Sequence, residues 1–163
     1  MRYNKNMKRI FGDRARRGFT LVEILIAVAL VVITAGIGLL ALNPSGQLAA
    51  ARNTERQLQL QGILNAVRQN IADTTTGVFT CTSGLLPTST KTMSSANGGY
   101  NIAPCLVPIY LQTLPFDPVA SSSHYTSNTD YNTGYTIVYN ASTTQITVAA
   151  PYAELGKTVL ITR

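Results

Sequence analysis

The chain has 163 residues, a formal net charge of +6 and two cysteines, with 45% hydrophobic and 12% charged residues. This length leaves room for one modest domain beside a membrane segment. The positive charge suggests a nucleic-acid partner, but seven of the 13 basic residues lie within residues 1–18. Residues 19–163 hold six basic and six acidic residues and are neutral. We therefore predict no nucleic-acid binding.

An apolar segment follows the basic N-terminal residues. From Ile24 to Leu42 the only polar side chain is the hydroxyl of Thr34. As a helix this run is about 28 Å long, close to the hydrocarbon thickness of a bilayer. It is longer than the apolar part of a secretory signal and ends without a small-x-small cleavage site. We therefore expect residues 19–42 to form a membrane helix that the mature protein retains, with the preceding basic residues on the cytoplasmic side.

Glu23 lies at one end of this apolar segment. An ionised carboxylate there is expensive, by a few kcal/mol, and usually has a partner. One interpretation is that Glu23 lies shallow enough to reach the lipid headgroups. The other begins with a cut between Gly18 and Phe19, which creates a new α-amine. In a neighbouring copy displaced along the helix axis, that amine would neutralise Glu23 across a subunit interface, which predicts an assembly.

Residues 16–23 resemble the class III signal of type IV prepilins and the related pseudopilins, in the sequence Arg-Arg-Gly-Phe-Thr-Leu-Val-Glu. The resemblance implies that a membrane prepilin peptidase cuts after Gly18 and removes residues 1–18 as a basic leader. It implies N-methylation of Phe19 and a role for Glu23 in polymerisation into a helical filament by an inner-membrane assembly platform. Val22 stands where Ile is commoner in the family.

The residues after the apolar segment favour a helix boundary. Asn is a good N-cap and Pro is tolerated at the first helical position. Asn43 and Pro44 therefore predict that the helix either ends and a second helix begins here, or continues with a kink. A plain junction between membrane segment and domain is the alternative. Type IV pilins commonly carry a helix-disrupting proline near this depth, and Pro44 lies a few residues later than usual.

Residues 43–73 predict an amphipathic helix. Leu60, Leu64, Val67 and Ile71 recur at spacings of four, three and four residues. We expect this stripe to pack on a sheet, with a helix–helix partner as the alternative. Charged residues are predicted to lie mostly away from the stripe, with Glu55 as a local partner for Arg52: Arg52, Glu55, Arg56 and Arg68.

Residues 77–133 are rich in Thr, Ser, Asn, Gly and Pro, which favours an irregular connection. Cys81 and Cys105 lie in it, on the non-cytoplasmic side if the topology is right, where disulfides persist. A bridge would close a loop of about 25 residues and contribute roughly 3 kcal/mol. Unbridged thiols are the alternative; with His124 as the only histidine, the pattern does not favour a metal site.

Within this region the run Leu111-Gln112-Thr113-Leu114-Pro115-Phe116-Asp117-Pro118 resembles a segment of the major pseudopilins of type II secretion and of related Gram-positive-type pilins. We expect Asp117 to cap a turn and Tyr110, Leu111 and Leu114 to face the core. A calcium ion often lies nearby in that family. The candidate ligands are Asp117 and Asp130, with Asn128 and Asn132, against the alternative of a solvated turn.

The last thirty residues alternate apolar and polar side chains in three runs separated by turns. Strands are predicted over residues 134–139, 144–149 and 157–162, joined as an antiparallel meander (residues 134–162) with one face for the helix. The fold class is therefore α+β: a long N-terminal helix, half transmembrane and half amphipathic, packed on a small antiparallel sheet in a head of residues 74–163, as in the pilin fold.

Catalytic motifs are not apparent. The sequence has no Gly-rich phosphate loop and no HExxH, and we expect His124 to be an exposed loop residue, so we predict no enzyme and no cofactor. The favoured function is a structural subunit of a type IV pilus-like filament, first a single-pass membrane protein and then part of a cell-surface polymer. The alternatives are a pseudopilin of a type II secretion or competence system, and a non-polymerising membrane-anchored binding module.

Overall fold

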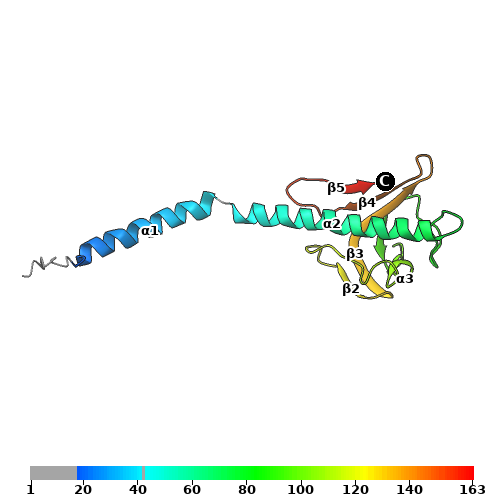
Figure 1. Cartoon of the computed structure of the whole chain (residues 1–163), viewed down its shortest axis with the longest axis horizontal. Helices are drawn as coiled ribbons and strands as arrows, with labels where there is room; N and C mark the ends of the chain where they lie inside the picture. Colours follow the sequence, from blue (N-terminus) through cyan, green and yellow to red (C-terminus); the bar gives the residue numbers. More distant parts are fainter. Residues whose placement is uncertain (1–17, 42) are drawn as a thin grey trace, which may run out of the picture. The chain divides into compact units, whose positions relative to one another are not determined.

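The computed structural model describes residues 18–41 and 43–163, and the chain divides between Asn43 and Pro44 into two compact units. The first unit contains helix α1 (Leu21–Ala41), and the second begins with helix α2 (Pro44–Asp73) and continues into a sheet (Figure 1). The predicted leader, apart from Gly18, lies outside the described residues.

Two separate helices replace one continuous helix, which is the first of the two outcomes predicted at Pro44. Ala41 ends α1 and Pro44 begins α2, while Asn43 has a φ of 40°, in the left-handed region. A residue that precedes proline is disfavoured in the right-handed helical conformation. Asn tolerates the left-handed conformation better than most residues, so Asn43 and Pro44 together end one helix and start the next.

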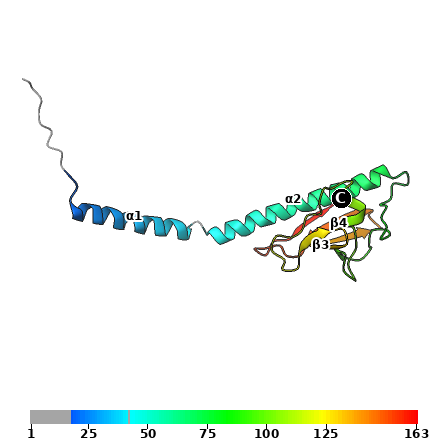
Figure 2. The same ribbon diagram turned by 90° about the horizontal axis from the view of Figure 1, so that it is seen from below.

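The predicted stripe on α2 is buried against the sheet. Leu60, Leu64 and Val67 are at most 1% exposed, Ile71 is half-buried, and all four pack in one core with side chains of the strands, joined by the buried Ile63. Figure 2 shows α2 running along the sheet, with β3 and β4 beside it. The stripe therefore packs on strands, as predicted, and the core that it enters also includes side chains of the short helix α3 (Ala103–Leu106).

The sheet in residues 43–163 has five strands, all paired antiparallel, in the order β1-β3-β4-β5 with β2 also paired to β3. The three predicted strands are confirmed as β3, β4 and β5. However, β3 starts at residue 130 rather than 134, because Tyr131 and Thr133 already alternate onto the buried face that Tyr135 and Ile137 continue. The strand bounds are β1 Lys91–Ser94, β2 His124–Ser127, β3 Asp130–Asn140, β4 Gln145–Ala150 and β5 Val159–Thr162.

The prediction of an irregular segment over residues 77–133 is too broad. This segment also contains β1, the short helix α3 (Ala103–Leu106), β2 and the start of β3. Its polar composition hides these elements because each buries few side chains, such as Met93 of β1, which is fully buried. Both short strands pair with β3, which lies far along the chain from β1 but only two residues after β2, and neither strand shows a clear alternation of apolar and polar residues.

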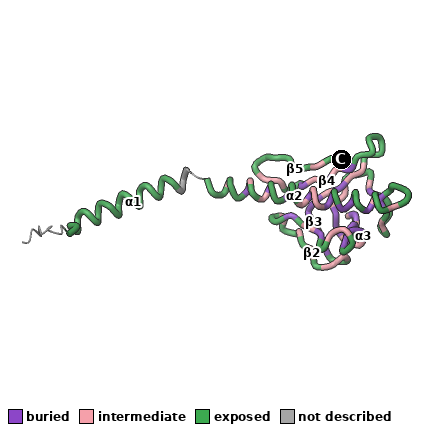
Figure 3. The backbone as a smooth tube through the Cα atoms, viewed as in Figure 1, coloured by how far each residue is buried: buried purple, intermediate pink, exposed green. Residues whose placement is uncertain are grey.

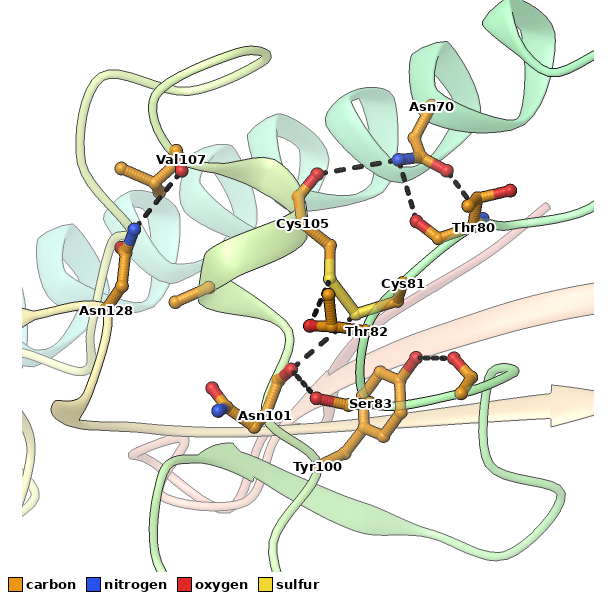
Figure 4. The surroundings of a disulfide bond; sticks show 12 residues. Asn70, Thr80, Cys81, Thr82, Ser83, Tyr100, Asn101, Cys105, Val107 and Asn128 are labelled. Carbon is orange, nitrogen blue, oxygen red and sulfur yellow. Dashed lines mark hydrogen bonds between the residues drawn. A yellow bond between two sulfur atoms is a disulfide. The ribbon is translucent and has the colours of Figure 1, made fainter.

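A disulfide joins Cys81 to Cys105 across 24 residues, with the two Cα atoms 5.2 Å apart (Figure 4). It connects the segment that follows α2 to α3. Asn70 of α2 reinforces this connection, because its side chain donates to the carbonyl of Thr80 at 3.2 Å and accepts the N–H of Thr80 at 2.9 Å. The long polar segment is thus attached to the helix at its start and at α3.

Candidate functional site

The residues around the predicted cleavage point lie outside any helix. Gly18, Phe19 and Thr20 precede α1, and Phe19 is 77% exposed. The peptide bond between Gly18 and Phe19 is therefore not part of the hydrogen-bonded ladder of α1. A peptidase would not have to unwind the helix to reach this bond.

Thr20 caps the first turn of α1. Its hydroxyl oxygen accepts the backbone N–H of Glu23 at 3.2 Å, and its carbonyl accepts the N–H groups of Glu23 and Ile24 at 3.1 and 3.2 Å. Thr-x-x-Glu is the pattern of a capping box, and a carboxylate in the first turn is also favoured by the helix dipole. Glu23 thus fits the start of a helix for a local reason that was not predicted, although the spacing from Thr20 to Glu23 in the sequence indicates it.

The apolar side chains of α1 are exposed on every side of the helix over residues 21–38. From Leu21 to Gly38 the mean hydropathy is 2.6 and none of the residues is buried, which Figure 3 shows as an exposed helix. Ile24, Leu25 and Ile26 are consecutive, point in different directions, and are each 54–61% exposed. By length and composition α1 is able to cross a membrane.

The one hydroxyl within this helix is satisfied internally. Thr34 donates to the carbonyl of Leu30 at 2.8 Å. Beyond Glu23 in the first turn, residues 24–38 of α1 are consequently apolar on every face, and a surface of this kind is covered by lipid or by other protein.

The second unit holds a charged cluster with a buried centre, Arg56 and Asp117, and partly exposed outer members, which we name the Arg56 cluster: Arg52, Asn53, Arg56, Asp117 and Glu154. Arg56 is fully buried and forms a bidentate pair with Asp117, with Nε to Oδ2 at 2.8 Å and Nη2 to Oδ1 at 3.1 Å. Its Nη1 contacts Glu154 Oε2 at 2.9 Å and Asn53 Oδ1 at 2.8 Å. Arg52 contacts the other oxygen of Glu154 at 2.6 Å.

This arrangement corrects two predictions. Arg56 does not lie away from the buried face of α2, and Arg52 pairs with Glu154 rather than Glu55, which instead accepts a hydrogen bond from Gln59 at 2.9 Å. The buried face is longer than the apolar stripe. Polar residues extend it at both ends with the same spacing of three and four residues. The buried positions at this spacing are Ala49, Asn53, Arg56, Leu60, Ile63, Val67 and Asn70.

The charges in the Arg56 cluster stabilise one another. Burial alone would raise the pKa of Asp117, but hydrogen bonds from Arg56 and from two backbone N–H groups outweigh it and hold that pKa below its usual value. Hydrogen bonds from Arg52 and then Arg56 lower the pKa of Glu154 to about 2. The hydrogen bond to Asp117 in turn raises the pKa of Arg56. All of these groups are therefore ionised at neutral pH.

Asp117 caps a turn, as predicted, since its Oδ1 accepts the N–H groups of Val119 and Ala120 at 2.9 and 3.0 Å. Leu114 is 1% exposed, and Tyr110 and Leu111 pack against the core, which also agrees with the sequence. The proline-rich segment, residues 111–118, is thus fixed to α2 through Asp117, whose carboxylate both closes the turn and pairs with Arg56.

The candidate calcium ligands are engaged with protein groups. Both oxygens of Asp117 contact Arg56, and Asp130 contacts His124 at 3.2 Å. The amide oxygen of Asn128 accepts from Tyr125 at 2.6 Å, and that of Asn132 accepts the N–H of Gly134 at 3.0 Å. Within residues 18–41 and 43–163 no three His, Cys, Asp or Glu side chains come together in a group able to hold a metal ion. Asp117 is thus the ion-pair partner of Arg56, and the calcium site stays a prediction.

His124 begins strand β2 and is not a loop residue, although it is exposed as predicted. Its ring nitrogens contact the carbonyl of Ser122 at 2.9 Å and the carboxylate of Asp130 at 3.2 Å. These two contacts, in this order of importance, raise the pKa of His124. They are local surface contacts.

Comparison with known proteins matches residues 13–39 to the family model of the prokaryotic N-terminal methylation motif. The match spans the predicted cleavage point, the Thr20 cap, Glu23 and most of α1. No curated protein and no solved structure matches the chain. The match agrees with the resemblance seen in residues 16–23.

Proposed function

Because the methylation motif is the prepilin signal of type IV pilins and pseudopilins, we propose that this chain is a structural subunit of a pilus-like filament. A prepilin peptidase removes residues 1–18 and Phe19 becomes the methylated N-terminus. The processed subunit then polymerises through residues 19–42. The observation that carries the proposal is the motif at residues 13–39 on a helix whose apolar side chains are exposed in every direction.

Helix α1 has two successive environments in this proposal. Lipid covers it first, with the basic residues before it on the cytoplasmic side and the disulfide-bonded head on the other side. Neighbouring copies of α1 replace the lipid in the filament. Lipid tails are as apolar as these side chains, so close helix packing and polar contacts have to supply the preference for the filament.

Glu23 supplies such a polar contact. Cleavage leaves an α-amine on Phe19, four residues before Glu23, which corresponds to about 6 Å along a helix. A copy displaced axially by about this distance brings its Glu23 beside the amine of its neighbour. Each charge alone costs a few kcal/mol in an apolar environment, and a hydrogen-bonded pair removes most of that cost.

The N-terminal residue of the assembled material tests this proposal. Mass spectrometry of purified filaments is expected to give a chain that starts at Phe19 and carries one added methyl group. A membrane-anchored binding module that keeps its leader would instead give a chain starting at or near Met1. Such a chain in the polymer would contradict the proposal.

The proline-rich segment favours a second candidate, a pseudopilin of a type II secretion or competence system. The sequence around Asp117 resembles that of major pseudopilins, and the structure gives its carboxylate a defined partner in Arg56. Deletion of the gene separates the candidates: loss of long surface fibres supports a pilus subunit, and loss of secretion or of DNA uptake without loss of such fibres supports a pseudopilin.

A further inference from the structure

Two segments of the head diverge from the Arg56 cluster. One is the β4–β5 loop, residues 151–158, which holds Glu154. The other is the segment around Asp117, which leads to β2. Figure 1 shows the β4–β5 loop on one side of α2 and β2 on the other. Because both segments contact Arg56, their places on the two flanks of the helix are fixed relative to each other.

The β4–β5 loop presents apolar side chains to the outside. Tyr152 and Leu155 are each 55% exposed, and Lys157 is exposed beside them. Leu155 has a φ of 60°, an uncommon conformation for a leucine that persists only where neighbouring contacts enforce it. Two hydrogen bonds between the side chain of Asn53 and the backbone of Glu154, at 2.9 and 3.0 Å, supply this constraint. The fold therefore fixes a conformation that leaves Leu155 outside the core.

The opposite flank carries a hollow of about 490 Å³, which we name the proline groove. Its wall is mostly apolar, and Phe116 in it is 41% exposed. Glu55 and Gln59 of α2 form its polar side. Within the described residues Glu55 accepts a hydrogen bond from Gln59 but has no ion-pair partner. Residues that line the proline groove include Glu55, Gln59, Leu114, Pro115, Phe116 and Tyr125.

We propose that the β4–β5 loop of one copy docks in the proline groove of the next copy. Tyr152 and Leu155 would lie against the apolar wall around Phe116, and Lys157 would lie beside Glu55. The charges are complementary and the apolar surfaces match in kind. This inference rests on the proposed function, because it concerns a filament of identical subunits.

The positions of the two surfaces suit such a polymer. A contact between different patches of identical molecules is heterologous and repeats without limit unless a ring closes. The loop and the groove lie on opposite flanks of α2, so a subunit that offers its loop to one neighbour still has its groove open for another. Residues 19–163 have no net charge, so copies of the processed chain do not repel one another as a whole.

Thiol labelling of the full-length chain tests the contact. Both natural cysteines are in the disulfide, so Leu155→Cys introduces a single reactive thiol. We expect a maleimide to react with it at least ten times more slowly in filaments than in detergent-solubilised subunits. Ser142→Cys in the exposed β3–β4 turn is the matched control and is expected to react at similar rates in both forms.

A charge exchange tests the pairing itself. Lys157→Glu and Glu55→Lys are each expected to lower the filament yield at least fivefold without changing the unfolding midpoint of the subunit. The double exchange is expected to restore the filament yield.

Filaments in which Leu155→Cys reacts as fast as in detergent would overturn the inference and leave the proposed function intact. Slow labelling in phosphatidylcholine vesicles but not in filaments would assign the loop to lipid and also overturn it. A double exchange no better than the single ones would reject the pairing, and absence of any polymer from the natural chain would reject both proposals.

Discussion

The substitution Asp117→Asn measures how much the Arg56 cluster contributes to the head. It removes one charge from the buried pair and keeps the shape of the side chain. The amide oxygen can still accept the N–H groups of Val119 and Ala120, so the change isolates the contact with Arg56.

The expected magnitude follows from the geometry. Both side chains are 0% exposed, and loss of one partner from a buried ion pair costs about 3–5 kcal/mol. Glu154 still contacts Arg56 at 2.9 Å, which places the loss of unfolding free energy at the lower end, about 3 kcal/mol. For a head of this size that corresponds to a fall in melting temperature of roughly 10 °C.

The assay is urea unfolding of the full-length chain in detergent micelles, followed by tyrosine fluorescence. Asp130→Asn is the matched control, because Asp130 and its partner His124 are 66% and 48% exposed, and an exposed pair is worth at most about 1 kcal/mol. An unfolding free energy of Asp117→Asn within about 1 kcal/mol of that of the natural chain, well below the cost of breaking a buried ion pair, would show that the pair with Arg56 does not stabilise the head.

Three further predictions concern pH, the disulfide and the helix cap. The pKa of Glu154 is lowered from its usual 4.5 to about 2, so its ionised form stabilises the head above pH 4.5 and that contribution is lost as the pH falls from 4.5 towards 2; Glu154→Gln should flatten the pH dependence of the unfolding free energy there, and an unchanged slope would contradict this. Replacing Cys81 and Cys105 with Ser should lower the unfolding free energy by about 3 kcal/mol in the same urea assay, whereas an equal midpoint would argue against a bridge in the natural protein. Thr20→Ala should remove about 1 kcal/mol of capping and raise hydrogen exchange at the Glu23 N–H about fivefold while Thr20→Ser does not, and equal exchange in all three chains would show that Thr20 is not the cap.

Much of the architecture could be predicted from the sequence because its signals are local. The apolar run to Leu42, the Asn43–Pro44 pair and the stripe through Leu60 and Val67 each act within a few turns of a helix. The β3–β4 hairpin is similar, because alternating strands flank a short polar turn closed by Asn140, whose side-chain oxygen accepts the N–H of Ser142 at 3.0 Å. These elements need no distant partner to be recognised.

The Arg56 cluster could not be predicted in this way. Arg56 lies 61 residues from Asp117 and 98 from Glu154, and nothing local distinguishes it from a solvated helix residue. The available signal was the spacing of Asn53 and Arg56, which continues that of the apolar stripe. Strand β1 was missed for the same reason, since its partner residues in β3 lie about 40 positions away (Lys91 pairs with Ile137), whereas β2 pairs with the adjacent start of β3 and was missed because its four residues are mostly polar.

Glu23 has two explanations, a capping box with Thr20 and a charge pair with a neighbouring amine. Glu23→Gln separates them, because Gln serves at this position of a capping box but carries no charge. The test is filament yield by electron microscopy, after mass spectrometry has shown that Glu23→Gln is still cut after Gly18. We expect processed subunits with at least a tenfold loss of filaments, and full assembly of the Asp130→Asn chain as a control. Normal filaments from processed Glu23→Gln subunits would contradict the charge pair on which assembly is proposed to depend.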